Sequence, residues 1–216
     1  MEFAPSRPVP VFPLPNAVLF PRVRMPLHVF ELRYRTMVRE ALSADRWIAI
    51  ALLAPGWERD YHGSPGFLPL GCVGRIDRIE WLPNDCYNLQ LVGECRVRFQ
   101  KVVREFPYRT CRVEKIDEHP YPEDDPLVRI EKQALWEVYR QLERAGAPLG
   151  VPALPDADFA TLVNAICTFA EIEPREKFAL LEIDSVIERG RRLRERLEKR
   201  LRRPVPPQKR TGGELN

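Results

Sequence analysis

Apolar residues are spaced in two ways along this chain, as short strand-like runs before residue 118 and as helical stripes after it. Two early runs, Val9–Leu14 and Val18–Phe20, are bounded by proline, and a third, Trp47–Leu53, is continuously apolar between Asp45 and Pro55. Proline fixes φ and lacks a backbone N–H, so these runs cannot join into one long element. The pattern predicts a short strand for each run.

The clearest strand signal lies between residues 87 and 99, where apolar and polar positions alternate. Its apolar members are Tyr87, Leu89, Leu91, Cys95, Val97 and Phe99, with Gly93 as the interruption. Strands are also predicted at Gly71–Leu82 and Tyr108–Ile116, and a shift of apolar phase after Ile76 predicts a bulge. About six strands with hairpin-like spacing favour a closed or nearly closed antiparallel barrel, because closure removes exposed edges.

Helical spacing occurs once in the first half, at Leu27–Leu42, and dominates the second half. The later helices are predicted at Leu127–Ala145, Phe159–Ala170, Pro174–Ile183 and Ser185–Arg203. The first of these places Ile130, Ala134, Leu135, Val138 and Leu142 on one face. Gly146 is the expected stop of this helix, and Ser185 with Glu188 forms a capping box for the last.

The α+β class follows, with a β-barrel domain at 1–118 and an α-helical domain at 125–203. Residues 204–216 have no apolar periodicity and are predicted to be a disordered tail. No apolar run approaches the roughly 20 residues that a membrane helix needs. The N-terminus has no basic segment followed by an apolar one, so no secretory signal is expected and the predicted location is cytoplasmic.

Charge is distributed unevenly along the chain. The formal net charge is +3, but residues 189–203 hold nine basic and two acidic side chains, which leaves the rest mildly acidic. One interpretation is a solvated helix packed by one apolar seam, its basic excess suiting the C-terminal helix dipole. The alternative is nucleic-acid binding, although the helix lacks interleaved aromatic residues for base stacking.

The loop at residues 55–67 is the candidate binding site. It holds Trp57, Tyr61, His62 and Phe67 among glycines and prolines. Aromatic side chains on a loop bury much area at little entropic cost, which suits them as anchors for a ligand. In the competing interpretation, Trp57 and Phe67 fold back and plug the barrel end.

The residue pattern gives little indication of a catalytic site or a metal site. His28 and Glu31 could form a pair, but no nucleophile accompanies them, and the simpler role of Glu31 is to favour the helix N-terminus. The three histidines and five cysteines show no zinc-ligand spacing. We therefore assign no catalytic residue, no metal and no cofactor.

Several segments, taken in order, closely resemble the N-terminal domain of Lon proteases. They are Phe12–Leu14, Leu19–Pro21, Pro26–Arg35, Gly71–Ile76, Gly93–Arg98 and Lys177–Glu182, with Asp184 and Arg189. The resemblance covers about residues 8–203 and implies a PUA-like barrel followed by a helical bundle. Lon proteases carry an ATPase and a peptidase after this domain, but the chain has no GxxxxGK[ST] string, so those activities are not carried over.

The resemblance thus implies a stand-alone, non-enzymatic module that binds polypeptide segments or a protein partner, with a link to proteolysis or quality control. Its surface would comprise the barrel, the aromatic loop and the cleft between the two halves. RNA or other nucleic-acid binding, through the barrel and the basic last helix, is the alternative function.

Overall fold

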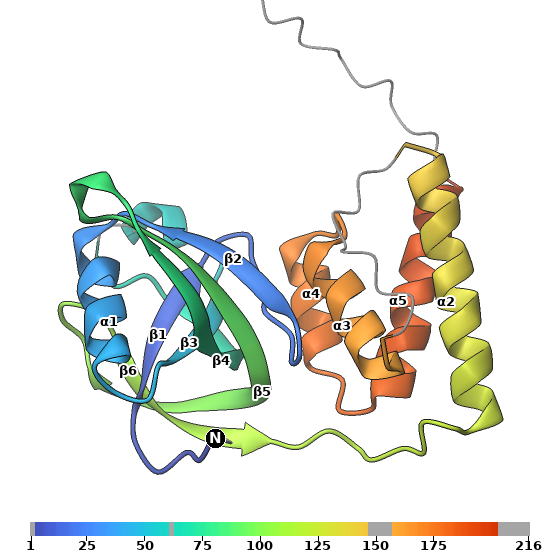
Figure 1. Cartoon of the computed structure of the whole chain (residues 1–216), viewed down its shortest axis with the longest axis horizontal. Helices are drawn as coiled ribbons and strands as arrows, with labels where there is room; N and C mark the ends of the chain where they lie inside the picture. The colour runs from blue at the N-terminus through green and yellow to red at the C-terminus, as the bar shows by residue number, and fades with distance from the viewer. Residues whose placement is uncertain (1–2, 61–62, 147–156, 203–216) are drawn as a thin grey trace, which may run out of the picture.

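A β-barrel lies at one end of the molecule and a group of helices at the other, in the computed structural model of residues 3–60, 63–146 and 157–202 (Figure 1). The strands are β1 (Val9–Leu14), β2 (Arg24–Val29), β3 (Trp47–Leu53), β4 (Phe67–Trp81), β5 (Tyr87–Arg104) and β6 (Thr110–Ile116). The helices are α1 (Leu32–Leu42), α2 (Pro126–Arg144), α3 (Phe159–Phe169), α4 (Pro174–Leu181) and α5 (Val186–Leu201). The predicted α+β class is confirmed, whereas the predicted tail at 204–216 lies outside the described residues.

The strand pairings run in a nearly closed ring, β5–β4–β3–β1–β6 and back to β5. Only two residue pairs join β1 to β6, and β2 pairs antiparallel with β5. The barrel departs from the antiparallel expectation at one place, because β1 and β3 are parallel. The chain between them contains β2 and α1, which together form the crossover that a parallel pair requires.

The segment before α1 folds differently from the prediction. Val18–Phe20 is buried but forms no strand, and the helix expected from Leu27 begins at Leu32. Residues 24–29 instead form β2, because Met25, Leu27 and Val29 alternate with polar residues or proline and turn toward the core.

Most other predicted elements are confirmed. The bulge in β4 is present as a register shift between Ile76 and Arg78 against β5. Ser185 caps α5 by accepting a hydrogen bond from the backbone N–H of Glu188. Gly146 follows α2 with a φ of 81°. The predicted apolar face of α2 is wrong at Ile130, which is 60% exposed, because Val128 turns inward instead.

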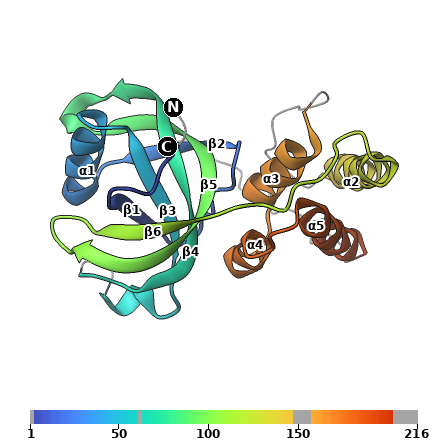
Figure 2. The same cartoon turned by 90° about the horizontal axis from the view of Figure 1, so that it is seen from below.

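The helices pack in layers against the barrel. α3 and α4 lie nearest the barrel and α2 lies on the far side, beside α5 (Figures 1 and 2). One apolar cluster includes Phe20 and Leu70 from the barrel together with Phe159, Val163 and Leu193 from the helices. The two halves therefore share part of their hydrophobic core.

Candidate functional site

The barrel-end hollow is a depression of about 240 Å³ beside the N-terminal turn of α1. Its walls are the middle of β1, Arg33 and Tyr34 of α1, residues 63–64 and the turn 105–109 between β5 and β6. The Tyr34 ring forms part of the wall and packs on Phe12 at 4.4 Å between centroids. Phe106 stands at the rim with 75% of its surface exposed. This hollow therefore combines an aromatic wall with an apolar group open to a ligand.

Cationic side chains frame the same hollow. The Arg33 guanidinium donates to the Gly63 carbonyl at 3.0 Å and lies 4.7 Å from the centre of the Tyr34 ring. The Arg109 guanidinium lies 4.5 Å from the centre of the Phe67 ring. Burial lowers the pKa of Arg109 from its ordinary value, but a guanidinium remains charged at neutral pH. The hollow thus offers positive charge beside apolar surface.

The candidate binding residues of the 55–67 loop lie in different surroundings in the structure. Phe67 is the first residue of β4 and packs edge-on against Phe99 at 5.0 Å, on the barrel core. Trp57 is half-buried in a short 3-10 turn, η1 (Trp57–Asp60), and is not among the residues lining the hollow. Tyr61 and His62 lie outside the described residues. Phe67 does not line the hollow but packs against Arg109, which does, so the proposal that the four residues form one binding site stays a prediction.

Sequence reasoning missed Phe106 and Arg109. Phe106 lies between two predicted strands, where a phenylalanine before a proline was the available signal, whereas Arg109 lies within the strand predicted from Tyr108 and precedes β6 in the structure. Phe106 and Pro107 are joined by a cis peptide bond. An aromatic residue in a polar turn is the kind of exposed group that binding surfaces use.

A second depression, the N-terminal hollow, measures about 470 Å³ and lies on the other side of Tyr108. It runs along the C-terminal part of α1, between residues 3–10 and the end of β5. At its edge, the Glu40 carboxylate accepts hydrogen bonds from the Tyr108 hydroxyl and from Arg104, the latter at 3.1 Å. The hydrogen bond from Tyr108 is the main cause that lowers the pKa of Glu40.

Tyr108 should give the protein a dependence of stability on alkaline pH. Burial, followed by the hydrogen bond to Glu40, raises the pKa of Tyr108 from 10.0 to about 12. Folding favours the neutral phenol, so its contribution is complete below pH 10 and is lost as pH rises through about 12. We expect the free energy of unfolding, measured in urea, to fall less between these pH values in Tyr108→Phe than in the native chain. Equal slopes for the two proteins would contradict this assignment.

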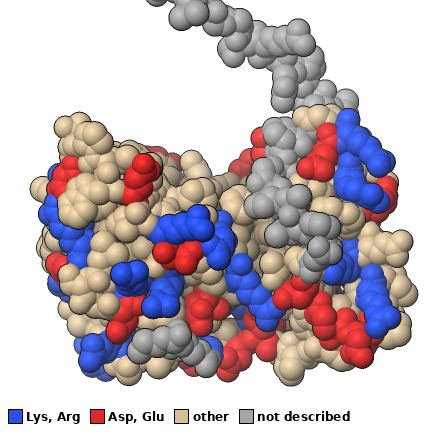
Figure 3. Space-filling view, viewed as in Figure 1, with Lys and Arg blue, Asp and Glu red and all other residues tan. Residues whose placement is uncertain are grey.

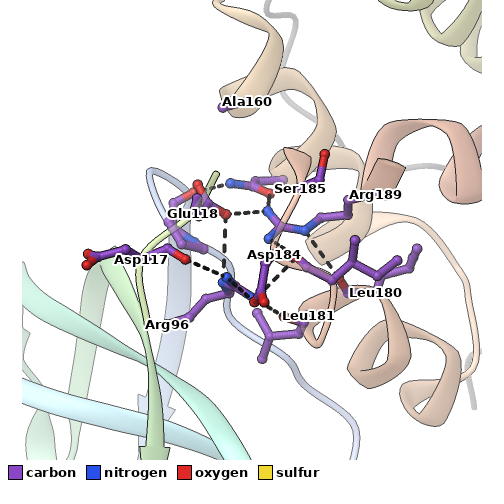
Figure 4. Close-up of polar contacts among 12 residues, drawn as sticks. Arg96, Asp117, Glu118, Ala160, Leu180, Leu181, Asp184, Ser185 and Arg189 are labelled. Carbon is purple, nitrogen blue, oxygen red and sulfur yellow. Dashed lines mark hydrogen bonds and ion pairs between the residues drawn. The ribbon is translucent and has the colours of Figure 1, made fainter. Parts of the chain in front are cut away.

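A buried charge cluster joins the barrel to the helices (Figure 4). Arg96 of β5 and Arg189 of α5 are both fully buried. Arg189 pairs with Glu118 at 2.6 Å, and Arg96 pairs with Asp184 at 2.8 Å. Arg96 also donates to the Leu181 carbonyl at 2.9 Å.

Arg189 has further partners in the helical half. It donates to the Ile183 carbonyl at 2.7 Å and to the Asn164 side-chain oxygen at 2.7 Å. The Asn164 amide in turn donates to the Pro21 carbonyl of the barrel at 3.1 Å. These two arginines and two carboxylates balance in charge, so the cluster holds the two halves together rather than leaving a reactive group free. We call this cluster the joint.

The remaining candidate residues have structural partners. His28 lies within hydrogen-bond distance of the Asn88 side chain, 2.9 Å from its oxygen, across β2 and β5. Glu31 pairs with Arg33 at 3.0 Å, and Arg35 ties α1 to the Asn84 carbonyl at 2.8 Å. Over the described ranges, no cluster of three or more metal-ligating side chains occurs. All five cysteines are free thiols.

The basic last helix is largely neutralised. Arg189 is buried in the joint, Arg194 pairs with Glu198 at 2.7 Å, and Arg200 pairs with Glu171 at 2.5 Å. Basic and acidic side chains are interspersed over both halves on the face shown in Figure 3. These pairs reduce the positive potential that phosphate binding would need.

A barrel joined to a helical half defines the class of N-terminal domains found in Lon-type proteins. The "Lon N-terminal domain protein" of Xanthomonas campestris superposes with a TM-score of 0.62 at 22% identity, over 89% of this chain and 98% of that one. The N-terminal domain of the Mycobacterium avium complex Lon protease gives 0.65 at 17% identity, over the same shares. At these identities the likeness concerns the fold.

The chain belongs to the family described as the ATP-dependent protease La (LON) substrate-binding domain, which matches residues 8–199. "Lon protease 2" of Myxococcus xanthus is 27% identical over 183 residues, or 81% of this chain. "Lon protease 2" of Herpetosiphon aurantiacus is 27% identical over 189 residues, or 86% of this chain. The chain spans about a fifth of the length of these relatives. Throughout the parts of the chain that the structure describes, no helix has the length and apolarity to cross a membrane.

Proposed function

We propose that this protein is a non-enzymatic module that binds exposed polypeptide segments in the cytoplasm and serves proteolysis or quality control. Family membership in the LON substrate-binding domains supports polypeptide as the ligand class. The five free thiols suit a reducing compartment. The barrel-end hollow is the proposed place of contact.

The observation that carries this proposal is the combination of Phe106 and the hollow behind it. Phe106 is the most exposed of the large apolar side chains in the described residues, and the Tyr34 ring and Arg109 lie along the same hollow. Binding sites for flexible segments use such apolar anchors, with polar groups at the rim to orient the ligand. Gly63 and Ser64, from the described part of the 55–67 loop, line the same hollow, and Trp57 of that loop is included in the proposed surface.

Phe106→Ala is expected to weaken binding of an unfolded polypeptide by tenfold or more. Burial of a phenylalanine contributes about 1.5–3 kcal/mol, which corresponds to at least about a tenfold change in Kd. The probe is reduced, carboxymethylated α-lactalbumin carrying a fluorophore, and anisotropy gives the Kd. Leu127→Ala is the matched control, because Leu127 is 67% exposed on α2, in the other half.

Two outcomes of this experiment test the polypeptide-binding function and the location of the binding site separately. If native, folded α-lactalbumin binds as tightly as the unfolded form, the polypeptide-binding function is wrong. If the unfolded form binds selectively but Phe106→Ala and Leu127→Ala behave alike, the function stands and the hollow is the wrong surface.

A further inference from the structure

We propose that the ligand of this protein is an extended, acidic peptide segment that places two large apolar side chains in the two hollows flanking Tyr108. This proposal rests on the proposed function and assigns the site and the chemistry of its ligand. The α1 groove denotes the barrel-end hollow and the N-terminal hollow taken together. The two hollows meet at Tyr108, which lines both of them.

The groove follows α1 from one end to the other. The barrel-end hollow touches the helix at Arg33 and Tyr34, whereas the N-terminal hollow touches it at Glu40 and Ala41. Seven residues separate Tyr34 from Ala41, so the two contact points lie about 10 Å apart along the helix axis. Both hollows are bounded on the other side by the chain from Arg104 to Thr110.

This separation selects a spacing in the ligand. In an extended segment, side chains four residues apart point to the same face and lie about 13 Å apart. Side chains two residues apart also share a face but span only about 7 Å, which is less than the separation of the two contact points, whereas a spacing of four covers it. A pair of large apolar residues at positions i and i+4 therefore fits the α1 groove.

The apolar walls of the two hollows can receive such side chains. The N-terminal hollow is walled by Val9, Ala41 and the Trp47 ring, and the ring of Phe3 meets Trp47 edge-on at 5.4 Å. The barrel-end hollow is walled by Val11, Pro13 and Tyr34, with Phe106 at the rim. Each hollow is open at the surface, so an extended segment can lie across both without unfolding the barrel.

Charge complementarity decides that the segment is acidic. Arg7 and Arg46 border the N-terminal hollow together with Asp45, and Arg109 borders the other together with Glu105. Within the described residues none of the three arginines forms an ion pair. The acidic Glu40 in the same groove is already paired with Arg104 and bonded by Tyr108. With Arg33 and Arg104 included, five arginines line the groove against three carboxylates, those of Glu40, Asp45 and Glu105, so its lining carries a net charge of +2. This excess favours carboxylates beside the apolar anchors and disfavours lysine.

The test uses the full chain and short fluorescein-labelled peptides in an anisotropy titration. The reference peptide is a Ser/Gly sequence with two leucines at i and i+4 and an aspartate outside each leucine. A second peptide has the same composition with adjacent leucines, and a third has lysine in place of aspartate. We expect the adjacent-leucine peptide to bind about tenfold more weakly, because one leucine loses its hollow. We expect the lysine peptide to bind at least about threefold more weakly.

A charge-reversal pair tests the site. Arg7→Glu should weaken the aspartate peptide at least about threefold and remove the preference over the lysine peptide. Arg129→Glu makes the same change at an exposed position on α2 and should leave both Kd values unchanged.

The outcomes distinguish this proposal from the proposed function. Equal Kd values for the two leucine spacings, or equal effects of the two charge reversals, would overturn the proposal that the α1 groove is the binding site. If unfolded α-lactalbumin is still bound selectively in that case, the proposed function stands. Displacement of the peptide by single-stranded RNA at equal concentration would show a nucleic-acid surface and would also overturn it. If the native chain binds folded and unfolded α-lactalbumin equally tightly, the proposed function is wrong, and the proposal for the α1 groove falls with it.

Discussion

Arg189→Met is expected to lower the free energy of unfolding by about 3–5 kcal/mol, the cost of breaking a buried ion pair. Methionine fills much of the same volume but removes the guanidinium that pairs with Glu118 at 2.6 Å. The Asn164 side-chain oxygen loses its donor at the same time, while the Ile183 carbonyl keeps its hydrogen bond from Arg96. A buried acceptor left without a partner costs roughly 1–3 kcal/mol, which adds to the loss.

Urea unfolding followed by circular dichroism measures this effect. Arg191→Met is the control, because Arg191 lies on the same helix but is half-exposed and pairs with Glu188 at its surface, a pair that contributes under about 1 kcal/mol. Adding Glu118→Gln to Arg189→Met should recover part of the stability by removing the orphaned charge. Similar losses for Arg189→Met and Arg191→Met would show that the joint does not stabilise the fold.

Gly93→Ala is expected to destabilise the chain by about 3 kcal/mol, at the upper end of what overpacking costs. A Cβ at this position would lie 2.1 Å from the Phe20 carbonyl oxygen, which is a backbone atom that cannot rotate away. The segment beside it is fixed, because Arg22 donates its N–H to Gly93 and Pro21 accepts from Asn164. The strain should therefore reach the joint as well as the barrel.

Gly66→Ala provides the matched control for this substitution. A Cβ at Gly66 meets its nearest neighbour, the Ala54 Cβ, at 3.6 Å, an ordinary contact distance. We expect its change in unfolding free energy to stay within about 0.5 kcal/mol. If Gly93→Ala unfolds at the same urea concentration as Gly66→Ala, the backbone near Phe20 is more adaptable than the packing indicates.

Local sequence patterns predicted most of the helices and strands, because the spacing of apolar residues within a segment depends on the conformation of that segment. The alternation from Tyr87 to Phe99 marked β5, and Ser185 with Glu188 marked the start of α5. The same kind of signal existed for β2, in Met25, Leu27 and Val29, but the helical spacing that continues from Val29 into α1 obscured it. The parallel pairing of β1 with β3 depends on the crossover between them, which no local pattern describes.

The joint could not be predicted from the chain alone. Arg96, Asp184 and Arg189 were singled out because they resemble family positions, yet arginine is ordinarily a surface residue and nothing local marks these two as buried. Their partners are distant in sequence, as Arg96 and Asp184 show. Phe106 escaped notice for a related reason, since its exposure depends on how the turn between β5 and β6 sits against α1 and β1.

The joint also sets the order in which the chain can mature on the ribosome. Arg96 leaves the ribosome 85 residues before Leu181, whose carbonyl it will bind. Until Leu181 and Asp184 emerge, the barrel carries that arginine without its partners from the helical half and leaves Phe20 and Leu70 without the helical side chains that cover them. A nascent chain of this protein therefore exposes apolar surface until its helical half has been synthesised. A chaperone near the exit tunnel would meet the chain in an incompletely folded state, which is the state that the finished protein is proposed to recognise in other polypeptides.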